Sequence, residues 1–269
     1  MTVGPAGPGP SGGTVPAVLV AHGSADPRAA QATEALARAV GAARPGLPVV
    51  ASYLDHREPR PGEALADLAA AGHRQVVLVP LLLTAAYHGR IDIPRAVAAA
   101  RTAGLDIPVR VAEVLGPTAR GVDPLLLAGL RRRLAEADRS GSGRASVDAV
   151  VLAAAGTRDA VARRTVDEVA GALGAELGVP VMAGYASAAP PTAGAAVARL
   201  RAHGAQRVGV AAYFLAPGQL YATAMASARE AGAVAFAAPL GDAVELARLV
   251  LARVDAALTA PDDVAGPVG

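Results

Sequence analysis

The sequence predicts an α/β protein built from two tandem domains, each a four-stranded parallel sheet flanked by helices. Short apolar runs alternate with longer Ala- and Arg-rich segments of helical period, which is typical of parallel βαβ units. The pattern recurs after about 132 residues, so that LVAHGSAD aligns with LAAAGTRD and VVLVPLLL with VGVAAYFL. The length of 269 residues fits two such units of about 120 residues each.

The first copy is expected to follow a Gly- and Pro-rich, uncharged, disordered leader over residues 1–15. Apolar, β-branched runs bounded by turn-forming residues predict its four strands, and the amphipathic stretches after them predict its helices. The expected strands are 17–21, 48–54, 75–80 and 107–112, and the expected helices lie near 28–43, 61–72, 90–103 and 122–137.

A linker is expected at 138–146, where the segment DRSGSGRAS interrupts the pattern with turn-forming and polar residues. The sequence therefore predicts a catalytic domain at 16–137 and a degenerate second copy at 147–259. A disordered tail is expected at 260–269. In the second copy the expected strands are 147–153, 180–184, 207–212 and 233–237, with helices between them and a last helix near 242–258.

The composition excludes several kinds of chemistry. The chain has no Cys, and all 25 of its basic side chains are Arg, so thiolate nucleophiles, Cys-held metal centres and Schiff-base lysines are ruled out. Five His and the carboxylates remain for metal binding and proton transfer. The 23 acidic residues nearly balance the Arg, which argues against a nucleic-acid partner. Without a long apolar run or the pattern of a signal peptide, a cytoplasmic protein with no membrane partner is expected.

Three polar residues of the first copy are lost from the second. In the alignment of the two repeats, His22 is matched by Ala155, His88 by Leu220 and Asp55 by Ser187. Residues needed only for folding tend to be kept in both copies, as the glycines and the apolar frame are. The loss of all three together predicts one site that belongs to the first domain alone.

These three side chains are expected to meet at one edge of the first sheet. Each follows the carboxyl end of a predicted strand, and a strand order of 2-1-3-4 places the first and third strands side by side, where open parallel sheets bind ligands. Two imidazoles and a carboxylate are a common ligand set for a divalent first-row metal. A neutral imidazole can also accept a proton near neutral pH, so both roles are open.

AHGSADP at 21–27, followed by VPLLLTAAYHGRIDIP at 79–94, resembles the paired signatures of the sirohydrochlorin chelatase family, the class II chelatases. The resemblance covers nearly the whole chain and matches the long, two-copy form. It implies an ATP-independent lyase, a cobaltochelatase or ferrochelatase, that inserts Co²⁺ or Fe²⁺ into sirohydrochlorin for siroheme or cobalamin biosynthesis. The metal is then a substrate, and no permanent cofactor is expected.

By this resemblance His22 and His88 are the catalytic, metal-handling pair, and Asp55 is their acidic partner. The carboxylates of sirohydrochlorin favour guanidinium groups and backbone N–H donors as substrate contacts. The candidates are Arg28, Arg90 and Arg95, with the N–H groups of Gly23 and Ser24 at the opening of the first helix. Ser24 and Asp92 are also expected to cap helices, while His56, His73 and His203 are expected at the surface.

A non-catalytic metal or tetrapyrrole carrier on the same fold is the alternative to the enzyme. Retention of both imidazoles favours the enzyme. At this point Fe²⁺ and Co²⁺, the siroheme and cobalamin pathways, a monomer and a homodimer, and a cleft inside or between the domains all stay open.

Overall fold

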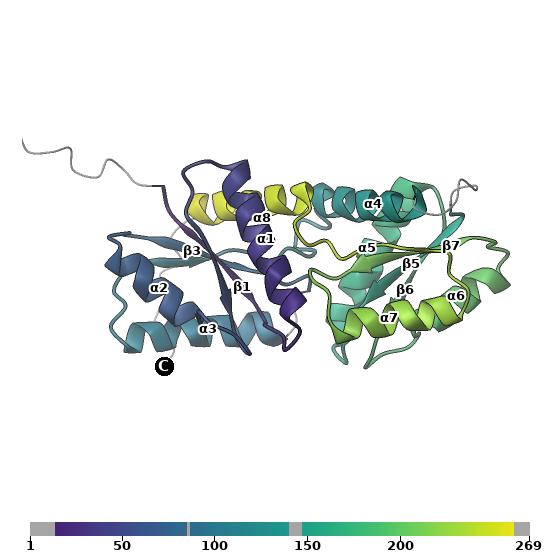
Figure 1. Ribbon diagram of the computed structural model, residues 1–269, viewed down its shortest axis with the longest axis horizontal. Helices are drawn as coiled ribbons and strands as arrows, with labels where there is room; N and C mark the ends of the chain where they lie inside the picture. The colour runs from purple at the N-terminus through teal and green to yellow at the C-terminus, as the bar shows by residue number, and fades with distance from the viewer. Residues whose placement is uncertain (1–13, 85–86, 140–146, 261–269) are drawn as a thin grey trace, which may run out of the picture.

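The computed structural model describes residues 14–84, 87–139 and 147–260, and it consists of two lobes lying side by side (Figure 1). Each lobe holds a four-stranded parallel sheet flanked by helices, which confirms the predicted fold class. The predicted leader and tail lie almost entirely, and the predicted linker mostly, outside the described residues, so they stay predictions. Of the linker 138–146, the first two residues belong to a helix that runs to Arg139.

The first lobe has the strand order β2-β1-β3-β4, as the sequence predicts. Its two central strands, β1 and β3, are short and fully apolar because both faces of the sheet are covered by helices. The strands are β1 (Ala17–Ala21), β2 (Val49–Tyr53), β3 (Val76–Pro80) and β4 (Val109–Val111), and the helices between them are α1 (Pro27–Ala43), α2 (Pro61–Ala70) and α3 (Tyr87–Thr102).

The second lobe repeats this arrangement with the order β6-β5-β7-β8. As in the first lobe, loops follow the carboxyl ends of its strands, and open parallel sheets bind ligands at this edge. The strands are β5 (Ala149–Ala154), β6 (Val181–Tyr185), β7 (Val208–Tyr213) and β8 (Ala235–Phe236), and the helices between them are α5 (Ala160–Leu177), α6 (Ala193–Ala202) and α7 (Gln219–Glu230).

The last helix of each repeat packs on the opposite lobe. The sequence assigns α4 (Pro124–Arg139) to the domain 16–137, but α4 packs on β7, β8 and α5 of the second lobe. It likewise assigns α8 (Val244–Thr259) to the domain 147–259, but α8 packs on α1, β3 and β4 of the first (Figure 1). Neither sequence repeat therefore forms a complete lobe without the other.

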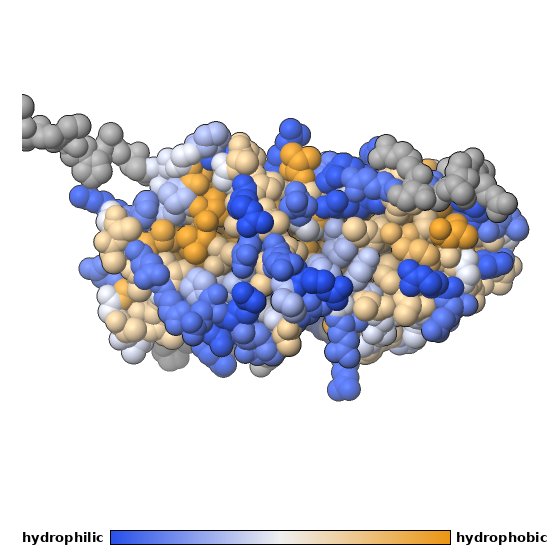
Figure 2. Space-filling view, viewed as in Figure 1, coloured by the Kyte–Doolittle hydropathy of each residue, from blue (hydrophilic) through white to orange (hydrophobic). Residues whose placement is uncertain are grey.

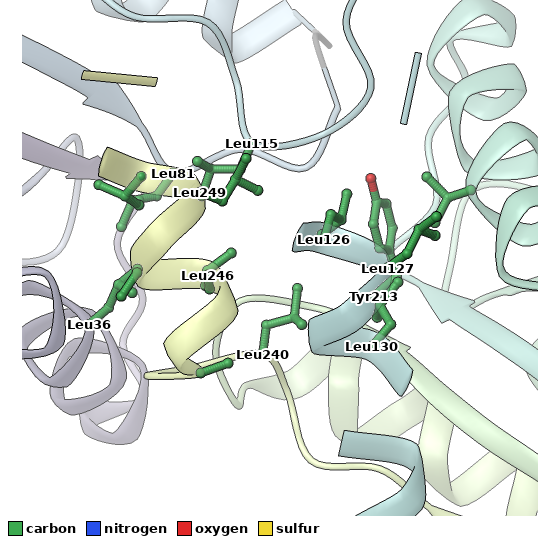
Figure 3. Packing of buried hydrophobic residues seen from close by; sticks show 14 of the residues in the cluster. Leu36, Leu81, Leu115, Leu126, Leu127, Leu130, Tyr213, Leu240, Leu246 and Leu249 are labelled. Carbon is green, nitrogen blue, oxygen red and sulfur yellow. The ribbon is translucent and has the colours of Figure 1, made fainter. Parts of the chain in front are cut away.

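One hydrophobic core runs through both lobes because α4 and α8 also pack against each other. Figure 3 shows α8 with Leu246 and Leu249 lying between Leu36 of the first lobe and Leu130 of α4. Each of these side chains is almost fully buried, and such a leucine stabilises the fold by roughly 2 kcal/mol. The shared core fixes how the two lobes sit relative to each other. Two further clusters fill the faces under α2 and α3 and under α6 and α7.

Two predicted helix caps are wrong. α1 begins at Pro27, and its N-cap is Asp26, whose carboxylate accepts the N–H of Arg28 at 2.9 Å. Proline suits the first helical position, so the residue directly before Pro27 takes the cap rather than Ser24. Ser24 instead accepts the N–H of Asp26 through Oγ at 3.1 Å. In α3 the helix already begins at Tyr87, so Asp92 lies inside it and does not cap it.

Candidate functional site

The backbone places His22 and Asp55 side by side at the carboxyl edge of the first sheet. His22 follows β1, Asp55 follows β2, and the N–H of Asp55 donates to the carbonyl oxygen of His22 at 2.8 Å. Gly23 makes this approach possible: its φ is +96°, and a Cβ there would lie 1.9 Å from the Asp55 carbonyl oxygen. Two of the three predicted metal-site residues therefore lie next to each other.

The second lobe keeps the same backbone without the chemistry. Gly156 has a φ of +92°, and a Cβ there would lie 1.9 Å from the Ser187 carbonyl oxygen. The N–H of Ser187 donates to the carbonyl oxygen of Ala155 at 3.1 Å, just as Asp55 donates to His22. The structure thus confirms the alignment of His22 with Ala155 and of Asp55 with Ser187.

The carboxylate of Asp55 is held in its ionised form. The N–H of His56 donates to Asp55 Oδ1 at 2.8 Å and lowers the pKa of Asp55, with the charges of His56, Arg60 and His22 acting in the same direction. His56 is exposed as predicted, but its Nε2 lies 3.6 Å from Asp55 Oδ2, so it belongs to the surroundings of the site. More than half of the Asp55 side chain is exposed, so the carboxylate is open to solvent.

His88 falls in the first turn of α3, which follows β3 along the chain. β3 is paired with β1, so the exits of the strands that carry His22 and His88 are neighbours in the sheet. The side chains of residues 85–91 lie outside the described part, and those of His88 and Arg90 are among them. Within the described side chains no three His, Asp or Glu residues gather into a metal-binding cluster.

Two cavities meet at His22. One, of about 870 Å³, lies in the first lobe; its charged lining includes Asp55, Arg60 and Arg95, and its floor consists mainly of alanines of α2 and α3. The other, of about 500 Å³, lies between the lobes and is lined by residues of both. Among its described lining residues, His22 is the single ionisable group apart from tyrosines. The site therefore opens both inside the first lobe and between the lobes.

The predicted substrate contacts lie in different places. Gly23 and Ser24 line the cavity between the lobes. They lie before the N-cap Asp26, so their N–H groups do not belong to the first turn of α1 as expected. Arg28 is exposed and forms an ion pair with Asp26, with Nη2 2.7 Å from Oδ2. Arg95 lines the cavity of the first lobe, as His22 does.

Arg60 is a site residue that the motifs did not reveal. It precedes α2, its Nη1 donates to the carbonyl oxygen of Leu54, and it lies 3.8 Å from Asp55 Oδ1. Its own backbone N–H donates to the Glu63 carboxylate at 2.8 Å, which satisfies one of the free N–H groups at the start of the helix. The sequence signal was Pro61 with an acidic residue two positions later, which marks a helix start directly beside Asp55.

The fold and the site together define a two-lobed α/β protein with an exposed histidine and an ionised carboxylate at the carboxyl edge of one of two duplicated parallel sheets. The chain belongs to the CbiX family, whose model matches residues 16–137 and 149–257. This match confirms the resemblance and the two-copy form expected from the sequence.

The solved structures that share the fold include two SirB proteins and DR2241. SirB from Bacillus subtilis with Fe³⁺ has a TM-score of 0.77 at 20% identity, over 91% of this chain and 96% of that chain. SirB from Bacillus subtilis subspecies spizizenii in complex with cobalt has a TM-score of 0.70 at 20% identity, over 91% and 95%. DR2241 from Deinococcus radiodurans, a multi-domain protein with structural similarity to chelatases, has a TM-score of 0.62 at 22% identity, over 95% and 57%.

No relative among the curated proteins matches the sequence. As for membranes, the helices in the described parts of the chain include none that is both long and apolar enough to cross a bilayer.

Proposed function

We propose that this protein is a lyase that inserts a divalent metal ion, Co²⁺ or Fe²⁺, into sirohydrochlorin without ATP. The observation that carries the proposal is the place of His22, which lies beside the ionised Asp55 at the junction of a charged cavity and an apolar cleft. Membership of the CbiX family supports it, as do similar structures described as SirB with Fe³⁺ and as a sirohydrochlorin chelatase with cobalt.

The two cavities suit the two parts of the macrocycle. The cleft between the lobes is lined by alanine, leucine and tyrosine side chains, which suit the flat, apolar face of a tetrapyrrole. The carboxylates at the rim of the ring need cationic partners, and Arg60 and Arg95 supply them on the side of the first lobe. A ring centred at His22 reaches both environments.

The reaction needs a partner for the metal ion and an acceptor for protons. Asp55 is ionised and exposed, so it attracts the hydrated cation. The imidazoles of His22 and His88 hold the ion or accept the pyrrole protons. One divalent ion replaces two protons on the ring, so charge is balanced and no redox partner takes part.

Imidazole and carboxylate ligands suit Fe²⁺ and Co²⁺ alike. With Fe²⁺ the reaction belongs to siroheme biosynthesis, and with Co²⁺ to cobalamin biosynthesis. The proposal includes a cytoplasmic protein, acting as a monomer or homodimer, with the metal as substrate and no permanent cofactor.

The test is an anaerobic assay in which purified protein, sirohydrochlorin and either ion are mixed and the absorption change is followed. Insertion that is faster than in the protein-free control and continues past one turnover supports the enzyme. A spectral change that stops at one equivalent of protein supports the carrier and contradicts the proposal. His203→Ala, a change of an exposed histidine of the second lobe, is the control for handling of the variants.

A further inference from the structure

Tyr213 reaches from the second lobe into the first. It is the last residue of β7, and its hydroxyl donates to the carbonyl oxygen of Leu83 at 2.6 Å. Only 3% of Tyr213 is exposed, and Figure 3 shows its ring among leucines of the shared core, beside Leu126 and Leu127. Burial raises the pKa of Tyr213, so the hydroxyl keeps its proton and stays a donor throughout the usual pH range.

Leu83 lies in the segment that leaves β3 and lines the cleft between the lobes next to His22. The N–H of Leu81 donates to Val20 at 2.9 Å, which ties the start of this segment to β1. The carbonyl of Leu83 also packs closely on Gly116, where a Cβ would lie 1.8 Å from its oxygen. Gly116 and the Tyr213 hydroxyl thus hold the same carbonyl group.

The contact has no counterpart in the opposite direction. The repeat position of Tyr213 is Leu81, whose side chain has no donor, and the repeat position of Leu83 is Leu215. The frame around both positions is otherwise kept: the N–H of Leu240 donates to the carbonyl oxygen of Phe214 at 2.8 Å, and the N–H of Leu115 donates to Leu82, the repeat counterpart of Phe214, at 2.9 Å. The lobe that lost the imidazoles therefore supplies the hydroxyl, and the lobe that kept them receives it.

We propose that Tyr213 is a positioning residue of the metal-insertion site: its hydroxyl fixes the Leu81–Thr84 wall beside His22 from the opposite lobe. This inference rests on the proposed function. The same segment continues along the chain to α3 and His88, so a shift of the Leu83 carbonyl displaces one wall of the site. A misplacement of about 1 Å near reacting groups can lower a rate about 100-fold.

The test compares Tyr213→Phe with Tyr221→Phe. Tyr221 also donates to a backbone carbonyl, that of Ala237 at 3.1 Å, but within the second lobe and away from both cavities. We expect Tyr213→Phe to lower kcat for metal insertion at least about 10-fold. KM for sirohydrochlorin should stay within about twofold, because the phenyl ring still lines the cleft and only the hydroxyl contact with Leu83 is lost. Tyr221→Phe should keep kcat, even if its Tm falls as much.

Hydrogen exchange gives a readout that does not depend on activity. In Tyr213→Phe, amides of the peptide 81–84 should exchange faster than in the wild type, and in Tyr221→Phe they should not. A wild-type kcat in Tyr213→Phe, or an unchanged exchange of this peptide, overturns the positioning role while the proposed function stands. A wild-type protein that inserts no metal overturns the proposed function itself.

Discussion

Arg253 of α8 donates to the carboxylate of Asp123, the residue before α4, at 3.1 Å, and so joins the two exchanged helices at the centre of the molecule. Its Nε also donates to the carbonyl oxygen of Val114 at 2.9 Å. Only 5% of Arg253 is exposed, which makes it the one arginine among the described residues that is classed with the buried core. A guanidinium in such a place is stable only with its partners.

Arg253→Leu should therefore destabilise the whole protein. Removing one member of a buried ion pair leaves the carboxylate of Asp123 without its partner, and we expect the free energy of unfolding to fall by about 3 kcal/mol. Chemical denaturation measures it. The control is Arg248→Leu on the exposed face of α8, and equal effects of the two changes would contradict the role of the buried pair.

Gly23→Ala should disrupt the site beyond its effect on stability. The new Cβ would lie 1.9 Å from the Asp55 carbonyl oxygen, so the loops of His22 and Asp55 must move apart. Gly156→Ala meets the Ser187 carbonyl oxygen at the same distance in the second lobe. We expect both variants to lose similar stability and Gly23→Ala alone to lose most metal insertion. Equal activity losses would contradict a site in the first lobe.

His22→Ala and His88→Ala should each lower metal insertion about 100-fold or more, since a general base contributes about that much. Their far-ultraviolet circular dichroism should stay that of the wild type, because His22 is exposed at the mouth of the cavities. Near-normal activity in either variant would remove that residue from the site.

Lowering the pH from about 8 to 5 should leave the contribution of Asp55 to metal binding intact. Its lowered pKa means that Asp55 is ionised throughout this range, so the wild type should not lose affinity for the ion through protonation of this carboxylate. Asp55→Asn should raise KM for the ion at every pH in the range, measured in the anaerobic insertion assay. An unchanged KM for the ion in Asp55→Asn would contradict the role of this carboxylate.

Arg60→Gln and Arg95→Gln should raise KM for sirohydrochlorin about 10-fold each, because each variant loses a charged hydrogen bond worth about 1.5 kcal/mol to a rim carboxylate. The value of kcat should change little. Arg164→Gln, on the exposed face of α5, is the matched control. An unchanged KM in both cavity variants would show that the carboxylates bind elsewhere.

The sequence predicted the positions of the central strands and the place of His22 because both depend on local pattern. Apolar runs alternate with helical segments, and a histidine directly after a buried strand can only lie at the sheet edge. The sequence motifs missed Arg60. Its guanidinium lies near Asp55 only because the turn after β2 folds back toward that residue. The sequence placed the caps of α1 and α3 wrongly because neighbouring polar residues compete for a cap, and the position of proline or of the first turn decides between them.

By itself, then, the sequence determined the two-copy α/β fold, the family and the loss of the imidazoles from one copy. Only the tertiary structure decided that α4 and α8 are exchanged between the lobes, that His22 lies between two cavities, and that Tyr213 holds the opposite wall. The physical reason is that amphipathic period shows which face of a helix is buried but not against which sheet. Two duplicated sheets offer each last helix equivalent apolar surfaces, and the packing of the complete chain selects one.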